Sequence, residues 1–153
     1  MNFCEIINFL KTKICRESSY CHIAYFTNKN MINKNSSIGV NSTKKRYKNE
    51  NITTHAEIQA LNNLRYKLTK YRIRKIKVDL FVVRFLKNGE LSLSAPCLHC
   101  SIELSKNKYV EINNLYYSTQ NGLIKIKFND WMKTEDKCTS KGWKYHLCSR
   151  NKK

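Results

Sequence analysis

The chain has 153 residues and a mass of 18.1 kDa, which suits a single globular domain. Hydrophobic residues make up 41% of it, enough for a core, while one proline and four glycines exclude collagen-like proteins and chains rich in flexible linkers. Lysine and arginine number 29 against 11 acidic residues, so the formal net charge is +18 and a polyanionic partner has to be considered.

The composition also offers a simpler origin for this charge. Most of the basic residues are lysine, and asparagine, isoleucine and tyrosine are also abundant. These are the residues that A- and T-rich codons encode, whereas a protein that binds phosphate groups favours arginine with its planar, bidentate side chain. We therefore expect codon composition to account for the charge more than nucleic-acid binding does.

Membrane insertion and secretion are not expected. The chain has no run of 18 apolar residues, so we predict no transmembrane helix and no membrane partner. Charged residues interrupt the first 15 positions, which lack the features of a signal peptide. We expect a cytoplasmic or otherwise intracellular, reducing environment, in which seven cysteines indicate metal ligation or burial rather than disulfides.

The first third of the chain is predicted to contain one helix and two strands. Apolar residues from Phe3 to Ile14 recur at helical spacing and predict an amphipathic helix. Strands are expected over 23–27 and 31–40, separated by a turn at 28–30. The polar and basic segment 42–53 is expected to be a loop.

The middle of the chain is predicted to contain a helix and a central strand. Thr54 and Glu57 have the spacing of a helix capping box, which predicts a helix from there to about Lys70. Segment 78–86 is nearly continuous in apolar residues, as is typical of a buried central strand. Asn88 and Gly89 predict a tight turn after it.

After the single proline, Pro96, we predict a helix from Cys97 to about Lys106. Strands over 112–118 and 123–128 are separated by too few residues for a helical crossover, so they are predicted to pair antiparallel. Interleaved helices and strands indicate an α/β fold formed by residues 1–128. Residues 129–153 are expected to be a basic C-terminal extension that packs in part on the same domain.

Two short motifs carry the predicted chemistry: His55-Ala56-Glu57 and Pro96-Cys97-Leu98-His99-Cys100. One imidazole and two thiolates at helix N-termini suit a catalytic zinc ion (Zn2+), which keeps three protein ligands and an open fourth position. Such an ion lowers the pKa of its bound water to about 7. Glu57 would move protons rather than bind the metal, whereas a structural zinc needs a fourth ligand and no neighbouring carboxylate.

In this order, the motifs match the His-x-Glu … Pro-Cys-x-x-Cys signature of zinc nucleobase deaminases. The chain from about residue 23 to 128 resembles the cytidine/deoxycytidylate deaminase superfamily. Residues 38–41 look like its strand-end Gly-x-Asn, and residues 78–97 look like its third strand leading to the zinc-binding helix. The resemblance implies a three-layer α/β/α sandwich with a five-stranded mixed sheet, and a homo-oligomer.

The resemblance also implies substrate contacts. Asn41 would touch the sugar or base, while the Ala56 amide and the Ala95 carbonyl would hold the pyrimidine edge. Asn41 can equally be a turn residue, because asparagine tolerates left-handed conformations. The family's nucleoside deaminases often carry Asn-x-Glu where this chain has Asn41-Ser42-Thr43, and the missing acid argues against ribose recognition.

The predicted antiparallel pairing of the last two strands resembles the cytidine deaminase branch of the superfamily. The local sequence His55-Ala56-Glu57-Ile58 instead resembles that of tRNA-adenosine deaminases. Because a helix cannot fit between those strands, we expect deamination of cytosine in a small nucleoside or nucleotide substrate, giving uracil and ammonia. One alternative is a deaminase acting on cytosine or adenine in RNA or single-stranded DNA. Another is a non-catalytic, basic nucleic-acid-binding protein with a structural zinc.

Two further features are open to a functional and a plain interpretation. The basic run 67–77 is either a solvated helix end or a groove for a phosphate or RNA backbone. If it lines the entrance to the zinc site, a polynucleotide substrate is favoured. A second zinc site could involve six residues, which we expect instead to be buried or idle: Cys15, Cys21, His22, Cys138, His146 and Cys148.

Overall fold

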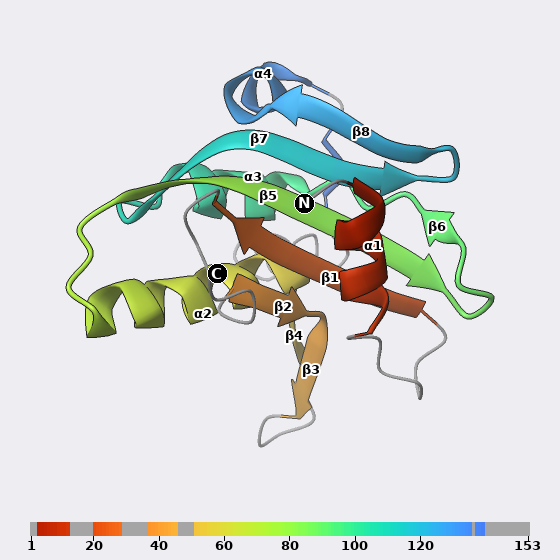
Figure 1. Cartoon of the computed structure of the whole chain (residues 1–153), viewed down its shortest axis with the longest axis horizontal. Coiled ribbons are helices and arrows are strands. Elements are labelled where there is room, and N and C mark those ends of the chain that lie inside the picture. Colours follow the sequence, from red (N-terminus) through yellow and green to blue (C-terminus); the bar gives the residue numbers. More distant parts are fainter. Residues whose placement is uncertain (1–2, 13–19, 29–36, 46–50, 136, 140–153) are drawn as a thin grey trace, which may run out of the picture.

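The computed structural model describes residues 3–12, 20–28, 37–45, 51–135 and 137–139. Its centre is a mixed, open sheet in the order β2-β1-β5-β7-β8, with β6 paired to β5 (Figure 1). The strands are β1 (Tyr20–Thr27), β2 (Ile38–Val40), β5 (Ile76–Leu86), β6 (Leu91–Ser92), β7 (Val110–Thr119) and β8 (Gly122–Lys127). The pairing of β5 with β7 is parallel and the other pairings in this sheet are antiparallel. The α/β prediction is confirmed.

The sheet has six strands, so the predicted number of five is wrong. The additional strand, β6, is only two residues long and pairs with the end of β5 through Leu91 and Phe85. So short a segment has no periodicity to detect in the sequence.

Strand β5 lies in the middle of the sheet, between β1 and β7, and both of its faces are buried. Val78, Leu80 and Val82 contribute to the core on one face. Phe81, Val83 and Phe85 contribute to a second core on the other face. The apolar run that predicted a central strand is therefore a consequence of burial on both sides.

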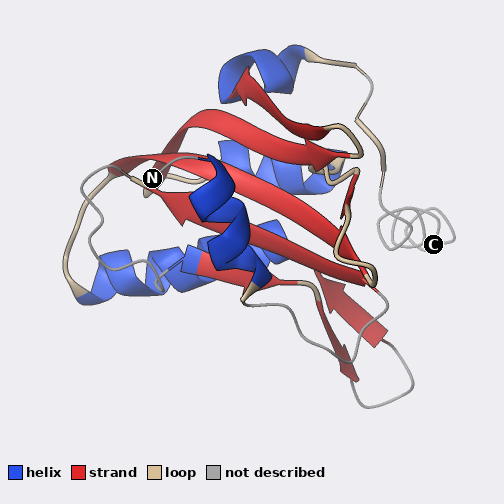
Figure 2. Cartoon of the chain, turned by 45° about the vertical axis from the view of Figure 1, so that its right-hand side comes forward, coloured by secondary structure: helices blue, strands red, loops and turns tan. Residues whose placement is uncertain are grey.

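Helices lie on both faces of the sheet (Figure 2). Residues of α2 (Ala56–Lys70), α3 (Leu98–Ser105) and α4 (Phe128–Lys133) join the core that contains Leu80, whereas α1 (Phe3–Lys11) joins the core that contains Phe81. The more specific three-layer sandwich of the cytidine deaminases stays a prediction. None of the helices in the described part of the chain is both long and apolar enough to cross a bilayer.

The predicted tight turn at Asn88 and Gly89 and the predicted antiparallel pairing of the last two strands are confirmed. The Gly89 N–H donates to the Leu86 carbonyl, and Gly89 has a φ of 81°. Strands β7 and β8 form an antiparallel hairpin that closes at the pair Thr119 and Gly122. As predicted, no helix separates these two strands.

Two local predictions are wrong, and one helix was not predicted. The expected loop over 42–53 contains strands β3 (Ser42–Lys45) and β4 (Asn51–Thr54), which pair antiparallel, because polar β-branched residues form a ladder as readily as apolar ones. Thr54 ends β4 and is not a helix cap; the N-cap of α2 is His55, without a side-chain cap hydrogen bond. Helix α4 was not expected, although its Trp131 is buried.

Parts of several predictions lie outside the described residues. The strand expected over 31–40 is observed only as β2, because residues 29–36 are not described. The end of the first helix and most of the C-terminal extension also lie outside them. The division of the chain at residue 128 stays a prediction.

Candidate metal centre

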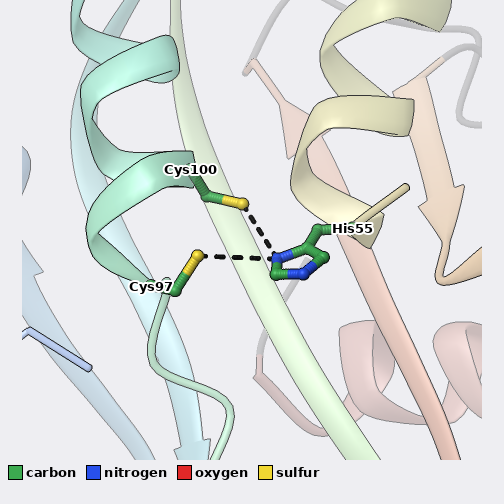
Figure 3. A group of neighbouring side chains, drawn as sticks. All are labelled: His55, Cys97 and Cys100. Atoms are coloured by element: carbon green, nitrogen blue, oxygen red, sulfur yellow. Dashed lines mark hydrogen bonds between the residues drawn. The ribbon is translucent and has the colours of Figure 1, made fainter. Parts of the chain in front are cut away.

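The three predicted metal ligands lie together (Figure 3). His55 is the N-cap of α2, Cys97 is the N-cap of α3, and Cys100 lies in the first turn of α3. The His55 Nδ1 atom is 3.5 Å from the Cys97 Sγ atom and 3.2 Å from the Cys100 Sγ atom. The two helix N-termini that hold these side chains therefore converge on one point.

This donor set fits a zinc ion. One imidazole nitrogen and two sulfur atoms lie within 4.8 Å of one another, both cysteines are buried, and His55 is half-buried. Within the described residues the cluster has three members, the number at which a zinc site keeps a position open for water. The partial positive charge at the N-terminus of α3 favours the thiolate form that metal binding requires.

The three donor side chains shift one another's pKa values. A hydrogen bond from Cys100 and a second from His55 lower the pKa of Cys97 to about 4. The same hydrogen bond and burial raise the pKa of Cys100, and the bond to Cys97 raises that of His55. Binding of a metal ion would require both cysteines as thiolates and would release the protons that these side chains carry.

Glu57 is a fourth ionisable side chain, beside the three candidate ligands. Its side chain is 1% exposed, and its Oε2 atom has no hydrogen-bond partner in the described part of the chain. Burial raises the pKa of Glu57 to about 7. A carboxyl group of this kind can accept and release a proton near neutral pH, which is the property that general acid–base catalysis needs.

The segment that leads to Cys97 is positioned by two buried serines. The Ser94 N–H donates to the Ser118 carbonyl at 3.0 Å, and the Ser94 hydroxyl donates to the Val82 carbonyl at 2.6 Å. The Ser118 N–H in turn donates to the Ser94 hydroxyl at 2.8 Å. These bonds join the segment to β5 and β7 just before Pro96, and sequence reasoning did not identify them.

The predicted substrate contacts lie close to this centre. The Ala56 N–H donates to Asn41 Oδ1 at 2.7 Å, and Ala56 is fully buried. Ala95 is half-buried and packs against the core. Asn41 therefore satisfies the first free N–H of α2, and the three substrate-binding roles stay predictions.

Sequence reasoning considered His22 only as part of a second zinc site. His22 lies in β1 on the face that carries Ala24, and burial lowers its pKa to about 4. The charges of His55 and Cys97 act on that pKa, so the ring lies near the metal centre. Its Nε2 atom has no hydrogen-bond partner among the described residues. Strand alternation was the signal that could have placed it there.

The other candidates for a second zinc site do not gather elsewhere in the described residues, whose one His/Cys cluster is the metal centre. Cys21 is buried, and Cys138 is exposed. The Cys138 carbonyl accepts the Leu98 N–H at 2.9 Å, so the chain after α4 reaches the start of α3. Cys15, His146 and Cys148 lie outside the described residues.

The basic run 67–77 does not border the metal centre. It begins in the last turn of α2, whereas His55 is the N-cap residue that precedes that helix. At 1.5 Å per residue, the two ends of α2 are roughly 20 Å apart. Figure 1 shows α2 running from the centre of the molecule to the edge where the loop to β5 begins.

Comparison with protein-family models and with curated proteins gives no match for this chain. A nitrogen and two sulfur ligands, a buried carboxyl group of raised pKa and two helix N-termini meet at one place. Such an arrangement can bind a metal ion and transfer protons beside it.

Proposed function

We propose that the protein is a zinc-dependent hydrolase that deaminates cytosine in a nucleoside or nucleotide, converting the base to uracil and releasing ammonia. The observation that carries this proposal is the position of Glu57, a buried carboxyl group two residues after His55 with an oxygen that has no described partner. Burying a carboxyl oxygen without a hydrogen-bond partner opposes folding, and a structural zinc site does not need such a group, so its position favours a catalytic role.

The topology supports the same assignment. The sheet is mixed, its central pair β5 and β7 is parallel, and β7 and β8 are antiparallel. Antiparallel last strands resemble the cytidine deaminase branch rather than the tRNA-adenosine branch. The proposal accordingly includes the three-layer sandwich of that family and its tendency to form homo-oligomers.

Each residue of the centre has a distinct role in the proposed reaction. His55, Cys97 and Cys100 would hold the zinc ion, with the α3 N-terminus stabilising the thiolates. The bound ion would supply Lewis-acid activation of a water molecule. Glu57 would accept a proton from that water at its free Oε2 atom and deliver it first to the pyrimidine ring nitrogen. The water oxygen would form a bond to C4 of the ring. A second proton transfer, from the added hydroxyl group through Glu57 to the amino group, would break the C–N bond and release ammonia.

Substrate binding would draw on the groups around the helix start. The pyrimidine edge would contact the Ala56 N–H and the Ala95 carbonyl, and Asn41 would contact the sugar or base. Because Asn41 Oδ1 already accepts the Ala56 N–H, substrate would have to share or replace that bond. The proposal therefore predicts that Asn41 affects both helix stability and substrate affinity.

The test is turnover by zinc-loaded protein. Cytidine, deoxycytidine and dCMP are incubated separately with wild type and with Glu57→Gln, and the uracil products and ammonia are quantified by mass spectrometry and a coupled ammonia assay. Wild type is expected to convert at least one of them and Glu57→Gln none. If wild type with one bound zinc per chain converts none, the small-substrate proposal is wrong, and tRNA and single-stranded DNA are assayed in the same way.

A further inference from the structure

The end of α2 and the start of the loop to β5 form an exposed surface that the proposed reaction does not use. We call residues 65–74 the α2 tip. Five of its ten residues are basic and none is acidic. Two of its tyrosines are among the most exposed large side chains of the described chain, Tyr66 at 71% and Tyr71 at 67%.

In the described part of the chain, no acidic residue forms an ion pair with a basic residue of the α2 tip. Glu111 pairs with Lys75 at 3.1 Å and with Lys77 at 3.3 Å, both just beyond the tip. Within the described part of the chain, no ion pair involves Arg72 or Arg74, and both are exposed. The tip therefore presents cations that an external anion can approach.

Aromatic rings and cations alternate over this surface and the loop beside it. The Lys70 Nζ atom lies 5.9 Å from the centre of the Tyr71 ring, and the Arg65 guanidinium lies 5.6 Å from that of Tyr109. The Tyr109 carbonyl accepts the Ile76 N–H, which joins the loop before β7 to the chain that follows the tip. Proteins that bind single-stranded nucleic acid combine the same two elements, aromatic platforms and a basic surface.

The backbone of the tip is strained at an arginine. Arg72 has a φ of 56°, in the left-handed region, where its N–H donates to the Thr69 carbonyl and the Ile73 N–H donates to the Leu68 carbonyl. These two bonds define a Schellman motif, whose left-handed position is usually glycine because a side chain is unfavourable there. The presence of an arginine at this unfavourable position points to a functional role of its side chain.

Codon composition does not account for this concentration of arginine. The chain is rich in lysine and has few arginines, yet Arg65, Arg72 and Arg74 all lie within the tip. Arginine binds phosphate groups with a bidentate geometry that lysine lacks. A codon bias acts on the whole chain and would not gather arginines at one end of one helix.

We propose that the α2 tip binds single-stranded nucleic acid, with Tyr66 and Tyr71 stacking on bases and Arg72 and Arg74 contacting phosphates. This goes beyond the proposed function, because the tip is roughly 20 Å along α2 from the metal centre. An anionic membrane is the less suitable partner. A helix that lies in a membrane interface needs an apolar face, and the apolar face of α2 is buried in the core.

The experiment measures binding of a fluorescent single-stranded 12-mer, oligo(dT) or oligo(rU), to the full zinc-loaded chain by anisotropy over a range of salt concentrations. Arg72→Ala with Arg74→Ala is expected to weaken binding at least tenfold and to lower the salt slope by roughly 1.4, since each lost contact to a single strand contributes about 0.7. The matched control removes two exposed lysines, Lys87→Ala with Lys125→Ala, and should change affinity less than twofold.

Two further variants distinguish the contribution of base stacking, and any effect of misfolding, from the contribution of charge to oligonucleotide binding. Tyr66→Ala with Tyr71→Ala should weaken binding at least fivefold and leave the salt slope unchanged. Arg72→Gly should weaken binding while its thermal midpoint stays equal or rises, because glycine relieves the left-handed strain. Loss of binding by a variant that is at least as stable as wild type excludes misfolding as the cause.

Several outcomes would overturn the proposal. Equal losses in the tip and control variants would assign binding to net charge alone, and a tip variant that loses affinity only for anionic phosphatidylserine vesicles would assign the tip to membranes. Glu57→Gln should keep full oligonucleotide affinity; a loss there would place the binding at the metal centre. Because this readout is independent of turnover, a failure to deaminate cytosine leaves the proposal standing, and a failure to bind leaves the deaminase standing.

Discussion

The side chain of Asn41 holds the start of α2, because its Oδ1 atom accepts the Ala56 N–H at 2.7 Å. The Asn41 N–H in turn donates to the His22 carbonyl of β1 at 3.1 Å. The position of His55, immediately before Ala56, therefore depends on hydrogen bonds that begin in the sheet. A metal ligand and a neighbouring strand are coupled through a single asparagine.

Asn41→Ala is expected to lower the free energy of unfolding by about 1 kcal/mol, the usual effect of losing a side chain that caps a helix. Urea denaturation of zinc-loaded protein measures it. Asn62→Ala, an exposed position on α2, is the matched control and should change stability little. Equal stabilities of wild type and Asn41→Ala would contradict the capping role. If Asn41 also contacts substrate, KM for the substrate rises in this variant.

Gly39→Ala is expected to displace α2 from β2. A Cβ atom at Gly39 would fall on the carbonyl oxygen of Ala56 and the main chain of Ala60, so the helix has to move. We expect a loss of about 3 kcal/mol or more in urea denaturation, together with weaker zinc binding because His55 moves with the helix. The control, Gly89→Ala, meets no atom and carries only the left-handed penalty of about 1 kcal/mol. Similar losses in both variants would refute the close approach.

His55→Ala, Cys97→Ser and Cys100→Ser are each expected to lower zinc affinity at least about 100-fold, because three ligands leave no redundancy. Metal content after dialysis against a weak chelator, measured by atomic emission, reports the loss. Cys4→Ser, an exposed cysteine in α1, should retain wild-type zinc. A full complement of zinc in all three ligand variants would exclude this cluster as the metal site.

Glu57→Gln is expected to retain zinc and to lower kcat about 100-fold or more, since glutamine has the size of glutamate but cannot transfer a proton. Circular dichroism and metal content establish that the variant is folded and loaded. Unchanged turnover would show that another group moves the proton. Loss of zinc would instead indicate that Glu57 is a ligand or supports one.

The buried imidazole of His22 is expected to lower the free energy of unfolding in mild acid. Its pKa is about 4 in the folded chain against an ordinary 6.5, so below pH 6.5 the unfolded chain takes up a proton that the folded chain does not. The folded state therefore loses up to about 3 kcal/mol as the pH falls from 6.5 to 4. Urea denaturation of zinc-free wild type and His22→Phe at pH 7.5, 6 and 5 measures the difference. Identical pH dependence in the two proteins would contradict a buried neutral imidazole.

Much of the fold was predictable because strong local patterns coincide with deep burial. The apolar run of β5, the helical spacing in α1 and the short hairpin turn before β8 each carry their own signal. The elements that were missed lack such a signal. Strands β3 and β4 are polar, β6 has two residues, and α4 has six.

The candidate site divides in the same way. His55, Cys97 and Cys100 were identifiable because the two motifs that contain them match, in this order, the signature of zinc nucleobase deaminases. His22 and Ser94 were not, because a lone histidine in a strand and a lone serine in a loop have no distinctive spacing. Their importance arises from the register that pairs His22 with Arg84 and from the bonds that tie Ser94 to Ser118.

Local sequence was enough to specify the donor atoms of the centre, the carboxyl group beside them and the antiparallel pairing of the last two strands. These features depend on residue types and on the few residues that separate the last two strands, and both can be read directly from the sequence. Long-range packing was needed to bring the His55 Nδ1 atom within 3.2 Å of the Cys100 Sγ atom, 45 residues away, and to bury Glu57 beside them. Such placements follow from how helices settle on a sheet to bury apolar surface, and no short stretch of sequence encodes them.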